Sequence, residues 1–102
     1  MMSYRIEWSS KSVGDLSAHV AFLKRVSAEA AKTTLSAIIA KGDSLAQFPE
    51  RCAEFPMPGH FPVVIRKCVV NGRYVILFGV CEDAVMIFRV LDARRKFDGL
   101  LE

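Results

Sequence analysis

The dipeptide Asn71-Gly72 constrains the fold more than any other feature, because it separates two apolar segments at residues 63–70 and 74–81. Both segments are rich in β-branched and aromatic residues, which favour strands. An Asn-Gly pair in this position predicts a tight two-residue hairpin, since both central positions of a type I′ turn need positive φ. Glu82-Asp83 predicts a second turn into a third strand at residues 84–91. We therefore expect a three-stranded antiparallel meander.

The N-terminal half has helical periodicity after one short strand. Residues 4–8 alternate apolar and polar side chains, which predicts a half-buried strand. Ser12 and Asp15 resemble a capping box that opens a first helix, Ser27 is a candidate N-cap for a second, and Pro49 ends it. The apolar stripes expected to be buried are Val13, Leu16, Val20 and Leu23 in the first helix, and Ala31, Leu35, Ile38, Ile39 and Leu45 in the second.

These elements predict a single α+β domain over residues 1–102. Its parts are an N-terminal strand, an antiparallel helical hairpin, a three-stranded meander that joins the same sheet, and a short C-terminal tail. Residues 49–62 contain all four prolines and are expected to be a connecting loop. The hydrophobic share of 52% is high for a domain of this size. A partner is therefore expected to complete some of the apolar surface.

The charge, the cysteines and the hydropathy give no indication of a nucleic-acid-binding, disulfide-bonded or membrane-spanning protein. A net charge of +3 is too mild to indicate nucleic-acid binding by itself. The three cysteines form no CxxC motif, and no signal peptide is evident, so we expect reduced thiols in the cytoplasm and no metal site. Cys68 and Cys81 fall in strand patterns, which predicts that both are buried. No apolar run is long enough to span a bilayer.

The predicted hairpins assign side chains to the two faces of the sheet. If residue 70 faces 73 and residue 81 faces 84, one face is nearly all apolar and should receive the helices. The opposite, open face then carries Arg66 in its interior and an Arg73–Asp92 pair at one end. It also carries the apolar residues Leu77, Met86, Phe88 and Val90. Such a face is too apolar for water, so we expect a partner or the C-terminal tail to cover it.

The ordered set of these parts resembles the RelE/ParE superfamily of toxins from bacterial type II toxin–antitoxin systems, and the ParE branch most closely. The resemblance covers nearly the whole chain. It includes a second helix that ends in Leu45-Ala-Gln-Phe-Pro49, one arginine at Arg66 on the strand that follows, and a last strand that leads into Asp92-Ala-Arg-Arg95.

The resemblance implies an activity for each branch of the superfamily. Members that cleave messenger RNA on the ribosome carry basic residues on the open sheet face and a Tyr or His near the C-terminus. Arg66 and Arg94 match the basic positions, but the expected Tyr would fall near Leu100, and the chain has only Tyr4 and Tyr74. Since that catalytic set is incomplete, the resemblance implies the ParE activity, which is inhibition of DNA gyrase by binding. Asp92 and Lys96, where the family often has His and Asp, depart from the pattern.

The resemblance also implies the partners and the residues that contact them. The effector candidates for target binding are Arg66, Arg94, Arg95 and Lys96, and the candidates for antitoxin contact are Leu77, Met86, Phe88 and Val90. The partners would be a ParD-like antitoxin in a hetero-oligomer and DNA gyrase, with no catalytic residue, cofactor, metal, membrane or direct sequence-specific nucleic-acid contact. The alternatives are a RelE-type messenger-RNA endoribonuclease with an incomplete catalytic set, or a non-toxic degenerate homologue. Arg66 could equally be a structural strand arginine.

Overall fold

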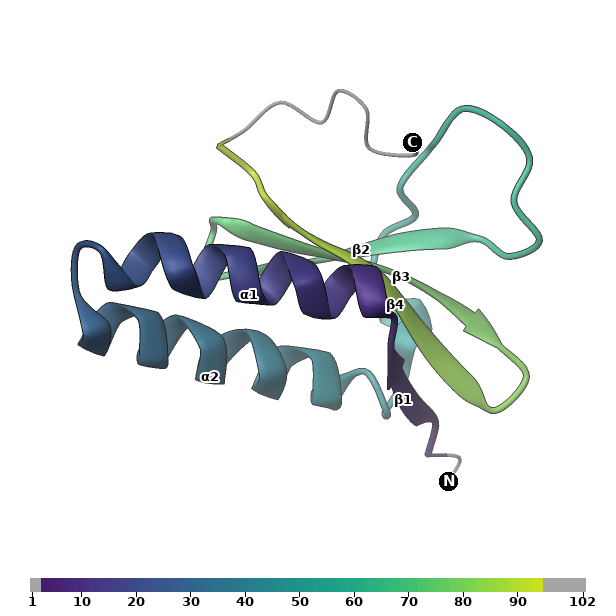
Figure 1. The fold of residues 1–102 in the computed structure, drawn as a ribbon. Coiled ribbons are helices and arrows are strands. Elements are labelled where there is room, and N and C mark those ends of the chain that lie inside the picture. The colour runs from purple at the N-terminus through teal and green to yellow at the C-terminus, as the bar shows by residue number, and fades with distance from the viewer. Residues whose placement is uncertain (1–2, 95–102) are drawn as a thin grey trace.

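The first strand and the last strand lie side by side at one side of the sheet. In the computed structural model, which describes residues 3–94, β1 (Arg5–Trp8) pairs in parallel with β4 (Ala84–Asp92) (Figure 1). The strand order is β1-β4-β3-β2, and the meander of β2 (Ile65–Val70), β3 (Tyr74–Cys81) and β4 is antiparallel. Helices α1 (Ser10–Lys24) and α2 (Ala28–Ser44) connect β1 to the meander. The α+β architecture predicted from the sequence is confirmed.

Both helices begin at a serine. Ser27 caps α2 as predicted, because its side chain accepts a hydrogen bond from the backbone N–H of Ala30. The prediction of Ser12 as the first cap is wrong. Ser9 caps α1 by accepting from the N–H of Ser12, while the fully buried Ser12 hydroxyl donates to the Ser9 carbonyl. Asp15 is therefore released from a capping role and faces the sheet.

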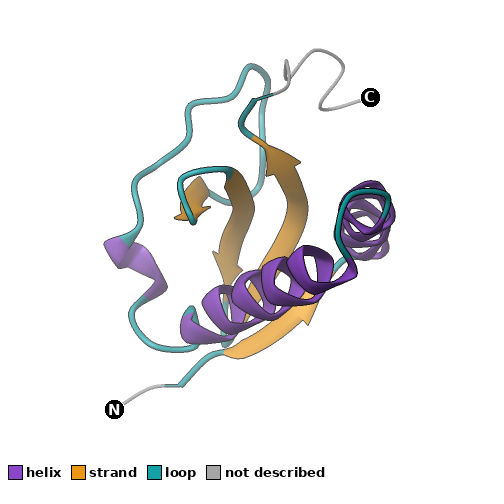
Figure 2. Cartoon of the chain, turned by 90° about the vertical axis from the view of Figure 1, so that its left-hand side faces the viewer, coloured by secondary structure: helices purple, strands orange, loops and turns teal. Residues whose placement is uncertain are grey.

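The two long helices cover one face of the sheet (Figure 2). The main core lies between them and the sheet, where Leu16, Ile38 and Leu45 pack on the central strands. Gly42 is needed in α2, because a Cβ atom at this position would collide with the indole of Trp8. Val13 and Ile39 belong to the predicted apolar stripes, yet both are exposed. The buried stripe of each helix is thus narrower than the sequence pattern indicates.

The hairpin between β2 and β3 is one residue longer than predicted. Val70 pairs with Tyr74, so the turn contains Arg73 as well as Asn71 and Gly72, and both of the latter have positive φ. Because side chains alternate along a strand, this slip exchanges the two faces of β2. The exchange buries Cys68 and Val70 in the main core, whereas the predicted register would have placed Lys67 there.

A β-bulge changes the second half of β4. The predicted pairing of Cys81 with Ala84 is confirmed and continues as far as Phe78 opposite Ile87. Leu77 then pairs with Arg89, which leaves Phe88 as the additional residue. Beyond the bulge the alternation is reversed. Val90 therefore faces the helices, fully buried, and its predicted place on the open face is wrong.

The loop after the short 3-10 helix η1 (Pro49–Arg51) covers part of the open face. Ile65, Val75, Leu77 and Leu91 form a second apolar cluster, against which Phe55, Met57, Val63 and Phe88 pack. A partner or the C-terminal tail was expected as the cover, but the proline-rich connection supplies at least part of it. Residues 95–102 lie outside the described residues.

Candidate functional site

An apolar groove lies where the loop meets the open face of the sheet. Its volume is about 280 Å³, and its lining consists of Met57, Phe61, Pro62, Val63, Ile65, Leu77, Phe88 and Arg89. Two of the predicted antitoxin contacts, Leu77 and Phe88, are therefore brought together in one site. Met86 lies beside them, opposite Gly79 on β3. Val90 lies on the other face of the sheet and cannot be reached from the groove.

Gly79 allows the loop to approach the sheet at this groove. A Cβ atom at this position would lie 2.6 Å from Val63 Cγ2 and 3.2 Å from Phe88 Cε2. The absence of a side chain therefore lets the loop residue and the bulged aromatic ring meet over β3. The glycine and the bulge together shape the groove from residues far apart in the sequence.

Arg66 does not lie on the open face. Its predicted position is wrong because the one-residue slip in the β2–β3 hairpin exchanges the two faces of β2. By its pairing with Phe78, it lies on the side of the sheet that carries the main core. Its guanidinium donates a hydrogen bond of 2.8 Å to the carbonyl of Cys52 and a longer one to that of Glu50. These contacts hold the end of η1 against β2, which is the structural alternative left open by the sequence.

The predicted contact between Arg73 and Asp92 forms at the end of β4, but its predicted place on the open face is wrong. Asp92 pairs with Tyr74 and lies on the helix side because it follows the bulge, and Arg73 reaches it from the turn. Arg73 Nη2 lies 3.2 Å from Asp92 Oδ2, and Asp92 is almost fully buried. The other carboxylate oxygen of Asp92 accepts from the backbone N–H of Arg94 at 3.0 Å. Asp92 therefore orients the chain as it leaves the sheet, and Arg94 is exposed there. Arg95 and Lys96 lie outside the described residues, so the basic tail is placed only at its start.

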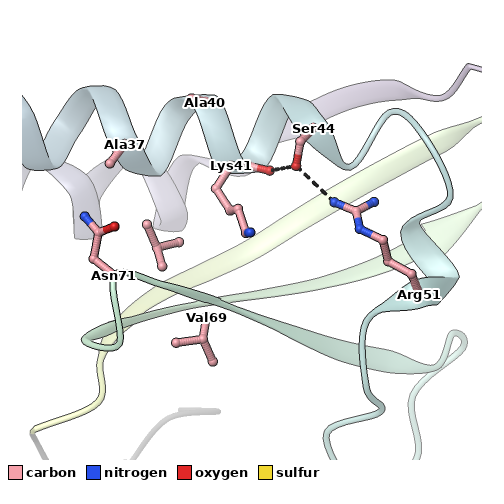
Figure 3. A pocket seen from close by; sticks show the side chains of 8 residues that line it. Ala37, Ala40, Lys41, Ser44, Arg51, Val69 and Asn71 are labelled. Atoms are coloured by element: carbon pink, nitrogen blue, oxygen red, sulfur yellow. Dashed lines mark hydrogen bonds between the residues drawn. The ribbon is translucent and has the colours of Figure 1, made fainter.

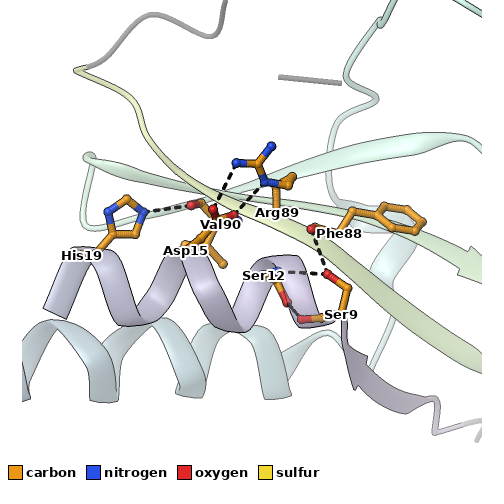
Figure 4. A network of polar contacts seen from close by, with 7 residues as sticks. All are labelled: Ser9, Ser12, Asp15, His19, Phe88, Arg89 and Val90. Atoms are coloured by element: carbon orange, nitrogen blue, oxygen red, sulfur yellow. Dashed lines mark hydrogen bonds and ion pairs between the residues drawn. The ribbon is translucent and has the colours of Figure 1, made fainter. Parts of the chain in front are cut away.

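Beyond the end of β1, the backbone N–H and C=O groups on the outer edge of β4 form hydrogen bonds with side chains of α1 and its N-cap (Figure 4). Ser9 Oγ donates to the carbonyl of Phe88 at 2.9 Å, and Asp15 Oδ2 accepts from the N–H of Val90 at 2.9 Å. His19 Nε2 lies 2.8 Å from the carbonyl of Val90 and must donate to it. The hydrogen bonds that Arg89 donates to the Asp15 carboxylate raise the pKa of Arg89 above its ordinary value. Helix α1 thereby protects this edge from the addition of a partner strand.

Two groups suited to acid–base chemistry, His19 and Tyr74, are engaged in packing, whereas His60 is exposed in the loop. His19 and Tyr74 have ring centroids 5.0 Å apart, and Tyr74 is only 3% exposed. Both lie on the helix side of the sheet, away from the apolar groove. Within residues 3–94, no three His, Cys, Asp or Glu side chains gather as a metal site requires. Neither helix of this part is long and apolar enough to cross a membrane.

A second cleft, which the sequence did not indicate, lies between α2 and the β2–β3 hairpin (Figure 3). Its volume is about 440 Å³, and Lys41 and Arg51 are its cationic residues. Arg51 donates to Ser44 Oγ and to the carbonyl of Phe48. Neither cation takes part in an ion pair among the described residues. The only sign of this cleft in the sequence was that Lys41 and Arg51, which lie in separate elements, are both basic.

The burial of the cysteines differs in part from the prediction. Cys68 is buried in the main core as expected, but Cys81 is exposed at the end of β3. Cys52 is half-buried and packs against the main core. Burial, followed by the adjacent Cys52, raises the pKa of the Cys68 thiol, and Lys41 and Arg51 lower it to a smaller extent. Two thiols and two cations are thus gathered at one side of β2.

Comparisons with known proteins agree with this fold. A chain described as "Chromosomal ParDE TA system from P. aeruginosa" is similar over 88% of this chain and 96% of its own length, with a TM-score of 0.70 and 20% sequence identity. At that identity the likeness concerns the fold. Residues 6–97 match the family model described as "ParE toxin of type II toxin-antitoxin system, parDE". No curated protein matches the sequence significantly.

A helical hairpin on a sheet of order β1-β4-β3-β2 defines the class of RelE/ParE-type toxin folds. Because the family match covers nearly the whole chain, the assignment can be made within that class. The chain belongs to the ParE toxin family of type II toxin–antitoxin systems.

Proposed function

We propose that this ParE-type toxin inhibits DNA gyrase by binding it, and that a ParD-like antitoxin neutralises the toxin in a hetero-oligomer. The observation that carries the proposal is family membership combined with an incomplete nuclease set. The sequence has no tyrosine after Tyr74, and Tyr74 is buried beside His19. RNA cleavage needs a group that accepts the proton of the 2′-hydroxyl and one that protonates the leaving oxygen. Binding requires neither group.

The apolar groove supports the site proposed for the antitoxin. Its lining is hydrophobic, Phe61 at its rim is 40% exposed, and Leu77 and Phe88 lie within it. An apolar segment of the antitoxin would place its side chains there, as segments that fold on binding commonly do. Met86 would extend this contact along β4. Since α1 protects the outer edge of β4, the antitoxin would bind through side chains there and not by adding a strand.

The basic end of β4 is the proposed surface for the target. Asp92 fixes the backbone of Arg94 as the chain leaves the sheet, and Arg95 and Lys96 follow directly in the sequence. Adjacent cations of this kind suit an acidic surface on gyrase or the phosphates of the DNA bound to it. Because gyrase and its DNA are cytoplasmic, the toxin would act in the cytoplasm.

The decisive experiment compares two activities of one preparation. The toxin is released from its antitoxin and added to purified gyrase with relaxed plasmid DNA, and in parallel to a reconstituted translation reaction. The proposal expects loss of supercoiling with accumulation of cleaved DNA, while translation continues. Loss of translation with normal supercoiling would support the endoribonuclease alternative. The absence of both effects, together with normal growth on induction in cells, would identify a homologue that has lost toxicity.

A further inference from the structure

A short antiparallel pairing outside the main sheet brings the chain after η1 alongside β2. Phe55 N–H donates to the carbonyl of Ile65 at 2.8 Å, and Lys67 N–H donates to that of Ala53 at 3.0 Å. These bonds flank an isolated bridge between Glu54 and Arg66. Continued by two residues, this register sets Cys52 directly opposite Cys68.

The backbone position suits a disulfide. Glu54–Arg66 is a pair whose own N–H and C=O groups point away from each other. The same register, continued by two residues, gives Cys52–Cys68 the next position of the same kind. In such pairs the Cα atoms are about 4.5 Å apart. That separation lies within the range of roughly 4.4–6.8 Å that a disulfide spans. Arg66 holds the carbonyl of Cys52 by a hydrogen bond of 2.8 Å, so the pairing is anchored at this end.

The side chains also meet. Cys52 packs against the core cluster that contains Cys68. Burial is the largest cause that raises the pKa of the Cys68 thiol, and the nearby Cys52 is the next. Cys68 is 6% exposed, whereas Cys52 is half-buried. A reagent can therefore reach Cys52 first, and Cys68 is placed to react second.

The cationic cleft adjoins this pair and favours a reagent of negative charge. Arg51 precedes Cys52 in the chain, Val69 follows Cys68, and both line the cleft together with Lys41 (Figure 3). Lys41 and Arg51 act on Cys68 by lowering the pKa of its thiol against the effect of burial. An anionic disulfide such as oxidised glutathione would thus be attracted to the opening beside Cys52.

We propose that Cys52 and Cys68 form a dithiol site that is converted to an intramolecular disulfide by exchange with anionic small-molecule disulfides. The Cys52 thiolate attacks one sulfur of the reagent, forming a mixed disulfide and releasing the first thiol. Cys68 then loses its proton and attacks Cys52 Sγ, which forms the protein disulfide and releases the second thiol. The cysteine pair loses two electrons, and the reagent is reduced by the same two.

The bond would close the segment 53–67 into a covalent loop. This segment carries Met57 and Phe61, which line the apolar groove. Oxidation would therefore restrict the loop that covers the open face, and reduction would release it. The chemistry of the pair does not depend on the proposed target, so it can be tested separately from toxicity.

The test uses the full chain with Cys81→Ser, which removes the exposed thiol and its side reactions. After incubation with oxidised glutathione, we expect both remaining thiols to be lost in a thiol titration. The intact mass should fall by two hydrogens, without a glutathione adduct. Adding Cys68→Ser should instead leave a stable adduct on Cys52, and adding Cys52→Ser should leave Cys68 unmodified. A persistent adduct when both cysteines are present, or no reaction unless the protein is denatured, would overturn the proposal.

A matched pair of reagents tests the role of the cleft. In the variant that also carries Cys68→Ser, Lys41→Gln or added salt should slow adduct formation on Cys52 severalfold with oxidised glutathione and leave adduct formation with neutral hydroxyethyl disulfide unchanged. Equal slowing with both reagents would contradict the electrostatic part of the proposal. Limited proteolysis supplies an independent readout, since cleavage within residues 53–67 should slow on oxidation. Equal cleavage of the two forms would show that the bond does not restrict the loop.

Discussion

Asp15 on α1 and Arg89 on β4 form a two-pronged ion pair next to the bulge. Arg89 Nε donates to Asp15 Oδ2 at 2.8 Å, and Nη2 donates to Oδ1 at 3.0 Å. The pair is partly buried, and Asp15 Oδ2 also accepts from the N–H of Val90. One carboxylate therefore fixes the helix against the strand and satisfies the backbone that the end of β1 leaves unpaired.

Replacement of Asp15 tests this relationship. Asp15→Ala should lower the free energy of unfolding by about 2–3 kcal/mol, because a backbone N–H and a guanidinium lose their acceptor in a partly buried place. Asp15→Asn should cost less, since its amide oxygen can still accept from Val90. Denaturant unfolding measures both. Asp43→Ala, at an exposed position, is the matched control. An equal loss of stability in this control would show that the contacts of Asp15 do not stabilise the fold.

Gly79 and Gly14 make a second pair of contrasting variants. Gly79→Ala should destabilise the protein by about 1–3 kcal/mol, because the new methyl group overlaps Val63 and displaces the loop. Gly14→Ala has open space around its Cβ on α1 and should stabilise by about 0.5–1 kcal/mol. Thermal unfolding checks both signs. An unchanged stability of Gly79→Ala would mean that the loop does not rest on β3.

Arg66→Ala distinguishes a structural from an effector role. Loss of its hydrogen bonds to the Cys52 and Glu50 carbonyls should cost about 1–2 kcal/mol of stability. The proposed inhibition of gyrase, measured per folded molecule, should remain, because the side chain of Arg66 holds the loop and does not contact the target. Circular dichroism and the supercoiling assay measure the two effects. Loss of inhibition at full stability would restore Arg66 as an effector residue.

The apolar groove predicts the site of antitoxin binding. Phe61→Asp should weaken the affinity for the antitoxin about tenfold or more, since a carboxylate would be buried among apolar side chains. Val26→Asp, at the exposed tip of the helical hairpin, is the control and should bind normally. Calorimetric titration of each variant with the antitoxin checks this. Equal affinities of Phe61→Asp and Val26→Asp for the antitoxin would show that the antitoxin does not bind in the groove.

The basic end of β4 predicts a separation of two functions. Arg94→Ala combined with Arg95→Ala should abolish growth inhibition, because the cations that would meet gyrase or DNA are removed. Antitoxin binding should stay within about twofold of the original, as the groove is untouched. Arg25→Ala, an exposed arginine on the hairpin tip, is the matched control. Persistent toxicity of the double variant would exclude this surface as the effector.

Local signals in the sequence were sufficient for the elements and the family. The Ser27 cap, the Asn71-Gly72 turn and the alternation of the strands act over a few residues, so propensity and periodicity report them. The contact between Arg73 and Asp92 was also foreseen, because the β2–β3 turn and the end of β4 lie side by side. Two of the candidate antitoxin contacts, Leu77 and Phe88, do line one groove.

Only the tertiary structure decided which face each of several side chains occupies. Because the turn includes Arg73, the side chains of β2 face the sides opposite to those predicted, and the bulge at Phe88 has the same effect on the end of β4. Arg66 and Val90 therefore lie on the helix side. Neither change has a local signature, because a strand shifts by one residue when that improves the packing of distant side chains. The sequence determined the elements and their order, while packing against the helices determined the register and hence the composition of the open face.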